Sequence, residues 1–180
     1  MEEASSMTEP MQSPDRDLEW RTAIIKEARG WLGVPYLHQA SDRRAGCDCV
    51  GLVRGVWREI CGPEPDMMLA YSPDWSEARG VETVLEAASN HLQTVADGGA
   101  LPGDVLVFRW RPHLPAKHCG ILVTPTRMVH AYQAAGKVTE SDVSHWTKRI
   151  VGVFAFRRWI IEDRVWRPPT LFECSRLVCG

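Results

Sequence analysis

Two cysteines separated by one aspartate stand at the start of a helical pattern. Cys49 follows Asp48, and apolar residues then recur at three- and four-residue spacing up to Ile60, which indicates one apolar helix face. Unpaired backbone N–H groups and the positive end of the helix dipole are concentrated in such a first turn. This environment favours a thiolate and can lower a cysteine pKa from about 8.5 to about 3.5–7.5. Cys49 is therefore a candidate nucleophile for a cysteine hydrolase.

A cysteine nucleophile needs a base beside the sulfur and a third group that orients the base. His118 and His130 lie in two neighbouring predicted strands. If the turn lies at residues 123–125, antiparallel pairing places 118 directly opposite 130 on one face, with Cβ atoms about 4.5–5.5 Å apart. One imidazole can then fix the tautomer of the other. Two unrelated sheet histidines are the alternative, and three others are assigned to the surface or to connections: His91, His113 and His145.

Zinc binding is the alternative to nucleophilic chemistry. The zinc-type ligands in these motifs are Cys47, Cys49, His118 and Cys119. Their C-x-C and H-C spacings are unlike those of common zinc sites, and adjacent strand residues point to opposite faces. We therefore expect no metal ion and no other cofactor.

Length and composition predict a single domain with a substantial core. The chain has 180 residues, 44% of them hydrophobic, and a net charge of -2, so no basic field argues for nucleic acid. No apolar run approaches the ~20 residues that span a bilayer, and we expect no membrane insertion. Residues 1–17 have neither the basic nor the apolar region of a secretory signal. We therefore expect synthesis in the cytoplasm without a signal peptide, and thiols rather than a disulfide framework for the six cysteines.

Helices precede strands along the chain, which predicts an α+β fold. Helices are predicted from about Leu18 to Leu32, from Cys49 to about Cys61, and for about twenty residues from Pro73. The expected antiparallel strands cover residues 105–108, 118–123, 128–132, 138–140 and 152–156.

Three parts of the chain are expected. Residues 1–16 are predicted to be a flexible N-terminus and residues 17–157 the folded domain. Residues 158–180 form a C-terminal extension rich in arginine and tryptophan. A docking arm and a disordered end are equal alternatives for that extension.

Four motifs in a fixed order resemble one enzyme family. They are Asp48-Cys49-x-Gly51-Leu52-Val53, Gly103-Asp104-Val105-Leu106-Val107-Phe108, His118-Cys119-Gly120-Ile121 and Val129-His130-Ala131. Over about Ala23 to Phe156 the chain resembles the NlpC/P60 peptidases, papain-like cysteine enzymes of bacterial cell walls. The stretches at 46–49, 54–57 and 71–75 resemble most the branch found in phage tails and phage-like gene transfer agents. The resemblance implies a papain-like NlpC-type fold, with N-terminal helices packed on a small antiparallel sheet of about five strands.

The resemblance also implies a role for each matching residue. Cys49 matches the nucleophile, His118 the general base and His130 the third, polar member that orients the base. Asp48 matches a residue that binds the free amine of a peptide stem in some members, and Tyr36 one that lines the site near the oxyanion. Val50 departs from the family pattern, because the usual residue there is serine, and a hydroxyl for substrate contacts is missing.

The implied function is a peptidoglycan endopeptidase that hydrolyses an amide bond of the peptide stem through an acyl-enzyme. Without a secretory signal, such a chain is expected to reach the wall in the tail of a phage-like particle, bound to a tail-tip, hub or baseplate protein. It would then act in the periplasm or cell wall of a new host. Two alternatives stay open: a catalytically silent tail-tip structural or adaptor protein that keeps the fold, and transfer of the acyl group to an amine instead of water.

Overall fold

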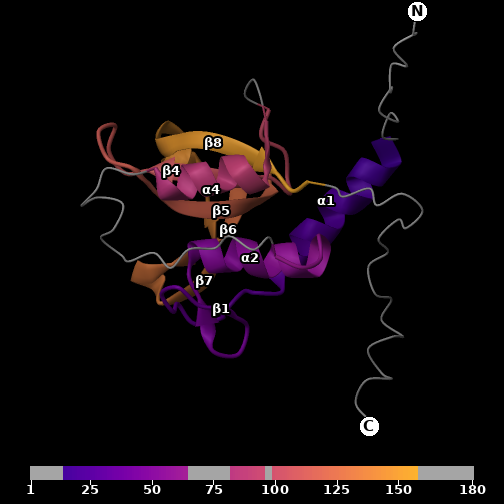
Figure 1. Cartoon of the computed structure of the whole chain (residues 1–180), viewed down its shortest axis with the longest axis horizontal. Helices are drawn as coiled ribbons and strands as arrows, with labels where there is room; N and C mark the ends of the chain where they lie inside the picture. The colour runs from indigo at the N-terminus through magenta and orange to yellow at the C-terminus, as the bar shows by residue number, and fades with distance from the viewer. Residues whose placement is uncertain (1–13, 65–81, 96–98, 158–180) are drawn as a thin grey trace, which may run out of the picture.

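An antiparallel sheet with helices along it forms the centre of the molecule (Figure 1). The computed structural model describes residues 14–64, 82–95 and 99–157. In these residues the helices α1 and α2 come first and the long strands follow, so the predicted α+β class is confirmed. None of the described helices is long and apolar enough to cross a membrane.

The main sheet has six strands in the order β3-β8-β4-β5-β6-β7, with every neighbouring pair antiparallel. All five predicted strands are present, and a short sixth strand, β3, pairs with β8 at the edge. Their bounds are β3 Gln93–Thr94, β4 Val105–Arg109, β5 Ala116–Thr124, β6 Arg127–Tyr132, β7 Lys137–Asp142 and β8 Ile150–Ala155.

The helices begin and end near the predicted positions, with two corrections. Helix α1 spans Pro14–Arg29, so it starts four residues earlier than predicted and ends before Gly30. Helix α2 spans Cys49–Ile60. Helix α4 spans Thr83–His91, and the predicted continuation to about residue 95 is wrong because β3 follows at once and pairs with β8. The start of that predicted helix, like residues 1–13 and 158–180, lies outside the described residues.

Apolar side chains fill both faces of the sheet. The larger cluster joins the sheet to the helices, and at its centre Leu52 and Val56 of α2 meet Val107 and Ile121 with almost no exposed surface. The smaller cluster lies on the other face, around Phe108. Helix α2 also contacts a small hairpin, β1 Ser41–Asp42 and β2 Gly46–Cys47, and β1 lies beside it in Figure 1.

The hairpin of β5 and β6 has a register two residues away from the predicted one. Thr124 pairs with Arg127, so the turn consists of residues 125–126, and a bulge follows in the pairing. Leu122 then pairs with Met128, which places residue 120, not residue 118, opposite His130. Because a shift of two residues keeps each side chain on its face, His118 and His130 still share one face, as diagonal instead of direct neighbours.

Candidate active site

The first turn of α2 is held in place by the Asp48 side chain. Asp48 is the N-cap residue, and its Oδ1 accepts a hydrogen bond of 2.8 Å from the backbone N–H of Gly51. Its Oδ2 accepts a bond of 2.6 Å from the N–H of Gln39. These bonds satisfy a helix donor that would otherwise lack a partner and tie the loop before the helix to the helix start. Asp48 thus caps the helix, while its contact with a substrate amine stays a prediction.

Cys49 is nearly buried and carries a perturbed thiol. Its Sγ lies 3.9 Å from the carbonyl oxygen of Lys117 on β5. A hydrogen bond from the Cys119 thiol, opposed by burial and assisted by a hydrogen bond and the charge of His118, lowers the Cys49 pKa well below its ordinary value. A thiolate is the nucleophilic form of cysteine. The geometry therefore makes Cys49 a thiol that ionises readily beside an imidazole.

The neighbouring thiols have the opposite character. Burial raises the pKa of Cys47 to about 12, and the charges of Asp48 and Cys49 act in the same direction. Cys119 donates its hydrogen bond to Cys49, which together with burial raises its own pKa. Both therefore stay protonated at neutral pH. All four cysteines in the described part of the chain are free: Cys47, Cys49, Cys61 and Cys119.

The two strand histidines contact each other directly. His118 Nε2 lies 2.8 Å from His130 Nδ1, so Nδ1 is the ring nitrogen of His118 that is available for its hydrogen bond with Cys49. His130 has no exposed surface. Burial, followed by the charge of His118, lowers the pKa of His130 to about 3. At neutral pH His130 is thus an uncharged imidazole that can accept a hydrogen bond from His118.

Aromatic rings enclose this histidine pair. Trp110 stacks on His118, with ring centroids 6.0 Å apart and planes at 23°. Trp146, on the 3-10 helix Ser144–Arg149, lies 5.6 Å from His118 and 5.4 Å from His130. Tyr132 stacks on His130 at 5.3 Å. The rings restrict the orientations of both imidazoles and limit the access of water to them.

Tyr36 and His38 lie on the loop that passes the helix start. Tyr36 is half-buried, and burial, with the charges of Cys49 and Asp48, raises its pKa to about 12. Its hydroxyl is therefore a neutral donor at physiological pH. His38 Nδ1 lies 3.5 Å from Asp48 Oδ2. Tyr36 thus lies close enough to the thiol for the charge of Cys49 to act on it, and its place beside the oxyanion stays a prediction.

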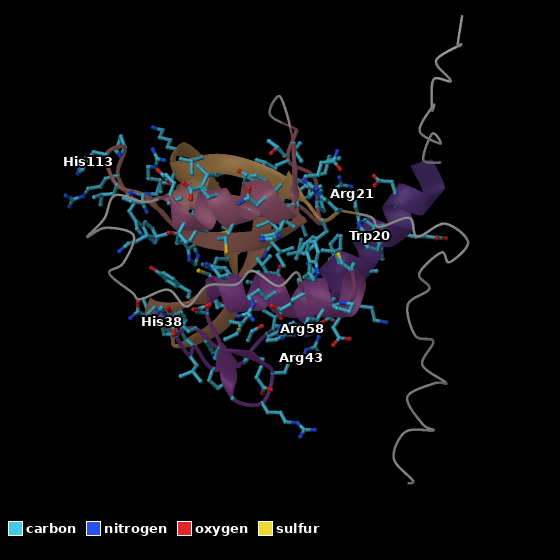
Figure 2. All side chains as sticks on the ribbon, viewed as in Figure 1. Trp20, Arg21, His38, Arg43, Arg58 and His113 are labelled. Atoms are coloured by element: carbon cyan, nitrogen blue, oxygen red, sulfur yellow. The ribbon has the colours of Figure 1, made fainter. Side chains whose placement is uncertain are left out.

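The remaining histidines lie apart from the pair. His113 and His145 are exposed, and His91 on α4 is half-buried. Figure 2 shows His113 in the loop between β4 and β5, at the edge of the molecule and well away from His38. Within the residues that the structure describes, no group of three or more histidine, cysteine or acidic side chains could hold a metal ion.

Three contacts of the site were not foreseen from the sequence. Cys119 was considered only as a zinc-type ligand, yet it supports the Cys49 thiolate. Trp146 was treated as part of a connection. Ser141 was not singled out, although its Oγ lies 3.0 Å from His130 Nε2. Only the alternation of side chains along β7, which gives Ser141 and Thr139 the same face, would have pointed to it.

The sequence matches the model of the NlpC/P60 family over residues 33–155. This match covers more than half of the chain and includes every predicted site residue. The chain therefore belongs to the NlpC/P60 family, whose members are cysteine peptidases. A curated relative, the gamma-DL-glutamyl hydrolase of Bacillus subtilis (strain 168), is 29% identical over 135 residues. That alignment covers 74% of this chain but only 29% of the relative.

Solved structures have the same fold. The peptidoglycan hydrolase RipB of Mycobacterium tuberculosis aligns with a TM-score of 0.54 and 22% identity, covering 82% of this chain and 72% of RipB. The NlpC/p60 domain of the peptidoglycan hydrolase SagA aligns with a TM-score of 0.53 and 21% identity, covering 76% of this chain and 98% of that domain. At these identities the likeness establishes the fold and leaves the activity to be argued from the site.

Proposed function

We propose that this chain is a peptidoglycan endopeptidase that hydrolyses an amide bond of the peptide stem. The observation that carries the proposal is the Cys49 thiol with its lowered pKa, at the start of α2 and in hydrogen-bonding contact with His118. A buried thiol needs no such environment for packing. A nucleophile does need it, because only the thiolate attacks a carbonyl carbon efficiently.

The proposed reaction has two stages. The Cys49 sulfur attacks the amide carbonyl, and backbone N–H groups at the start of α2 stabilise the negative oxygen that forms. His118 then gives a proton to the leaving amine, so the C–N bond breaks and a thioester remains on Cys49. In the second stage His118 takes a proton from water, and the oxygen of that water attacks the thioester carbon. The C–S bond then breaks, so the acid product leaves and the Cys49 thiolate paired with protonated His118 is restored. His130 holds the His118 ring in the orientation that both stages require.

The bond that we propose is a γ-glutamyl amide. The name of the Bacillus subtilis relative specifies a gamma-DL-glutamyl bond. In a peptide stem, the bond between D-glutamate and the diamino acid belongs to this chemical class. Val50 is half-buried and, with Cys119, lines an apolar pocket between α2 and α4. Where the family usually has a serine, this chain therefore has an apolar side chain, and a hydroxyl for substrate contacts is missing.

The test compares the wild type with Cys49→Ala on purified peptidoglycan. We expect the wild type to release fragments whose masses place the cut after D-glutamate, and Cys49→Ala to release none. Cys47→Ala is the matched control, because its thiol is buried beside the same helix start but stays protonated, and we expect it to cleave. If Cys49→Ala releases the same fragments as the wild type, Cys49 is not the nucleophile.

We further propose that a phage-like particle carries the enzyme in its tail to the wall of a new host. The proposal is supported by the amino-acid sequence of residues 46–49, 54–57 and 71–75, which resembles that of the phage-tail and gene-transfer-agent branch. In this setting the chain is made in the cytoplasm, is built into the tail beside a tail-tip or hub protein, and acts in the periplasm or wall. Residues 158–180 are the proposed docking arm.

A truncation tests the docking arm. A chain that ends at Arg157 keeps the family-matched region, so we expect normal cleavage of peptidoglycan in solution and loss of the protein from purified particles. Unchanged incorporation into particles would remove the proposed role of residues 158–180. A silent adaptor protein, the competing function, predicts the opposite pattern: incorporation of the full chain into particles and no cleavage by it.

A further inference from the structure

A line of polar side chains crosses three neighbouring strands beside the nucleophile. His118 is on β5, His130 on β6 and Ser141 on β7. The contacts along it are 2.8 Å between His118 Nε2 and His130 Nδ1, and 3.0 Å between His130 Nε2 and Ser141 Oγ. Both nitrogens of His130 are therefore engaged, one on each side. The line begins at Cys49 and ends at a half-buried hydroxyl.

The strand registers explain why these side chains meet. His130 pairs with Thr139, and Ser141 is two residues further along β7, so it is a diagonal neighbour on the same face. His118 is the corresponding diagonal neighbour on β5. The position directly opposite His130 on β5 is Gly120, where a Cβ would lie only 3.1 Å from the His130 Cβ. The missing side chain leaves His130 the space to reach both diagonal partners.

The reaction fixes which way the hydrogen bonds must run. When the Cys49 thiolate is paired with a protonated His118, both nitrogens of His118 carry a proton. His118 Nε2–H must then donate, so His130 Nδ1 must accept. Because His130 is uncharged at neutral pH, its single proton must lie on Nε2, and Nε2–H needs an acceptor. Among the described residues, the acceptor recorded for His130 Nε2 is the Oγ of Ser141.

We propose that Ser141 is a positioning residue that holds His130 in the tautomer with its proton on Nε2. This proposal rests on the proposed function, since it extends the same Cys49–His118–His130 site by one residue. The hydroxyl does not touch the substrate. It acts through His130, because a buried N–H without an acceptor destabilises the tautomer that carries it. Loss of the hydroxyl therefore favours the tautomer that cannot accept from His118.

Three variants of β7 test this role. Ser141→Ala removes the acceptor, and we expect kcat to fall about tenfold with little change in KM, as for a lost hydrogen bond that serves the reaction. Ser141→Thr keeps a hydroxyl on a strand-compatible side chain and should restore most of kcat. Thr139→Val is the matched control, because it removes a hydroxyl from the same strand and face without touching His130 Nε2. It should keep the wild-type kcat.

The tautomer is measured separately from activity, by the ring-nitrogen chemical shifts of His130 at neutral pH in ¹⁵N-labelled protein. We expect Nε2–H in the wild type, Ser141→Thr and Thr139→Val, and a mixture of tautomers in Ser141→Ala. The inference is overturned by Nδ1–H in the wild type, by an unchanged tautomer or kcat in Ser141→Ala, or by an equal loss in Thr139→Val. If the wild type cleaves no peptidoglycan, the proposed function fails, and the chemical shifts still decide the role of Ser141.

Discussion

The proposed nucleophile and its neighbours show how similar residues acquire different chemistry. Cys47, Cys49 and Cys119 lie close together, yet the pKa of Cys49 is lowered, while burial raises the pKa of Cys47 and the hydrogen bond with Cys49, followed by burial, raises that of Cys119. The difference comes from hydrogen bonds, because Cys49 receives bonds from Cys119 and His118 that stabilise its thiolate. Reactivity at this site therefore depends on partners and not on burial alone.

Removing the Cys119 thiol should raise the pKa of Cys49. In Cys119→Ala the thiolate loses its donor, so less of it is present at pH 6 and alkylation by iodoacetamide slows there. The pH dependence of the alkylation rate should move to higher pH, and Cys119→Ser, which keeps a donor, should move less. Identical profiles for wild type and Cys119→Ala would show that Cys119 does not stabilise the thiolate.

His130 should make the protein less stable in acid. Its folded pKa is about 3, against about 6.5 in an unfolded chain. Between these two pH values the unfolded state therefore binds a proton that the folded state does not bind. The contribution of His130 to the free energy of unfolding is fully present above pH 6.5 and decreases as the pH falls towards 3. The expected slope is about 1.4 kcal/mol per pH unit. Urea titrations of wild type and His130→Gln should show a shallower slope for the variant, and equal slopes would contradict the argument.

At the scale of the elements, the sequence predicts which face of the sheet each side chain of β5 and β6 occupies, but not the pairing register of the two strands. The alternation of side chains placed His118 and His130 on one face, and that expectation is confirmed by their contact. The direct pairing of 118 with 130 was wrong because the turn has two residues and a bulge follows it. Trp146 reaches the site only through packing of a distant segment, and the alternation along β7 indicates the face of Ser141 but not its contact with His130. The α2 helix was the best predicted element, because residues adjacent in the sequence determine both its apolar face and its N-cap.

Helix α2 needs a glycine at position 51 because the preceding loop crosses it there. A Cβ on Gly51 would lie 1.9 Å from the Ala40 carbonyl oxygen, a backbone atom that cannot rotate away. Gly51→Ala should therefore lower the free energy of unfolding by at least about 2 kcal/mol and lower kcat by more than about tenfold, since it displaces the loop of Tyr36. Gly99→Ala is the control, because among the described residues other than its chain neighbours no atom lies within 4 Å of its Cβ position. Equal stability of the two variants in thermal unfolding would contradict the close approach.

At the scale of the whole molecule, two ion pairs of the described residues join the first helix to the sheet region: Arg29 with Glu140 on β7, and Arg21 with the buried Asp104 just before β4. Arg21 Nη1 donates to Asp104 Oδ1 at 2.8 Å and to the Pro102 carbonyl at 3.1 Å. Asp104 is 1% exposed and also accepts from the backbone N–H of Leu101. Burial raises its pKa, and these donors oppose the rise. The Arg21–Asp104 pair thereby fixes α1 against the turn that precedes β4, with Asp104 buried and Arg21 partly exposed.

Arg21→Met should leave the Asp104 carboxylate buried without its cation. We expect a loss of about 2–3 kcal/mol at pH 7, less than for a fully buried pair because Arg21 is partly exposed. Because the pKa of Asp104 is raised, its carboxylate becomes protonated as the pH falls towards 4, and a neutral carboxyl group does not need the cation. The loss in free energy of unfolding of Arg21→Met relative to wild type should therefore become smaller. Arg44→Met, at an exposed arginine of the β1–β2 turn, should change little. A deficit that grows in acid would contradict the assignment.

The central claim is that the Cys49 sulfur becomes acylated by the stem peptide. The most direct measurement mixes the enzyme with a synthetic stem peptide, quenches with acid within the first turnover, and maps the adduct by mass spectrometry. The account predicts an added mass equal to the acyl half of the peptide, on the fragment that contains Cys49, and no adduct or cleavage with Cys49→Ala. Cleavage by Cys49→Ala at the wild-type rate, or an adduct on another residue, would contradict it.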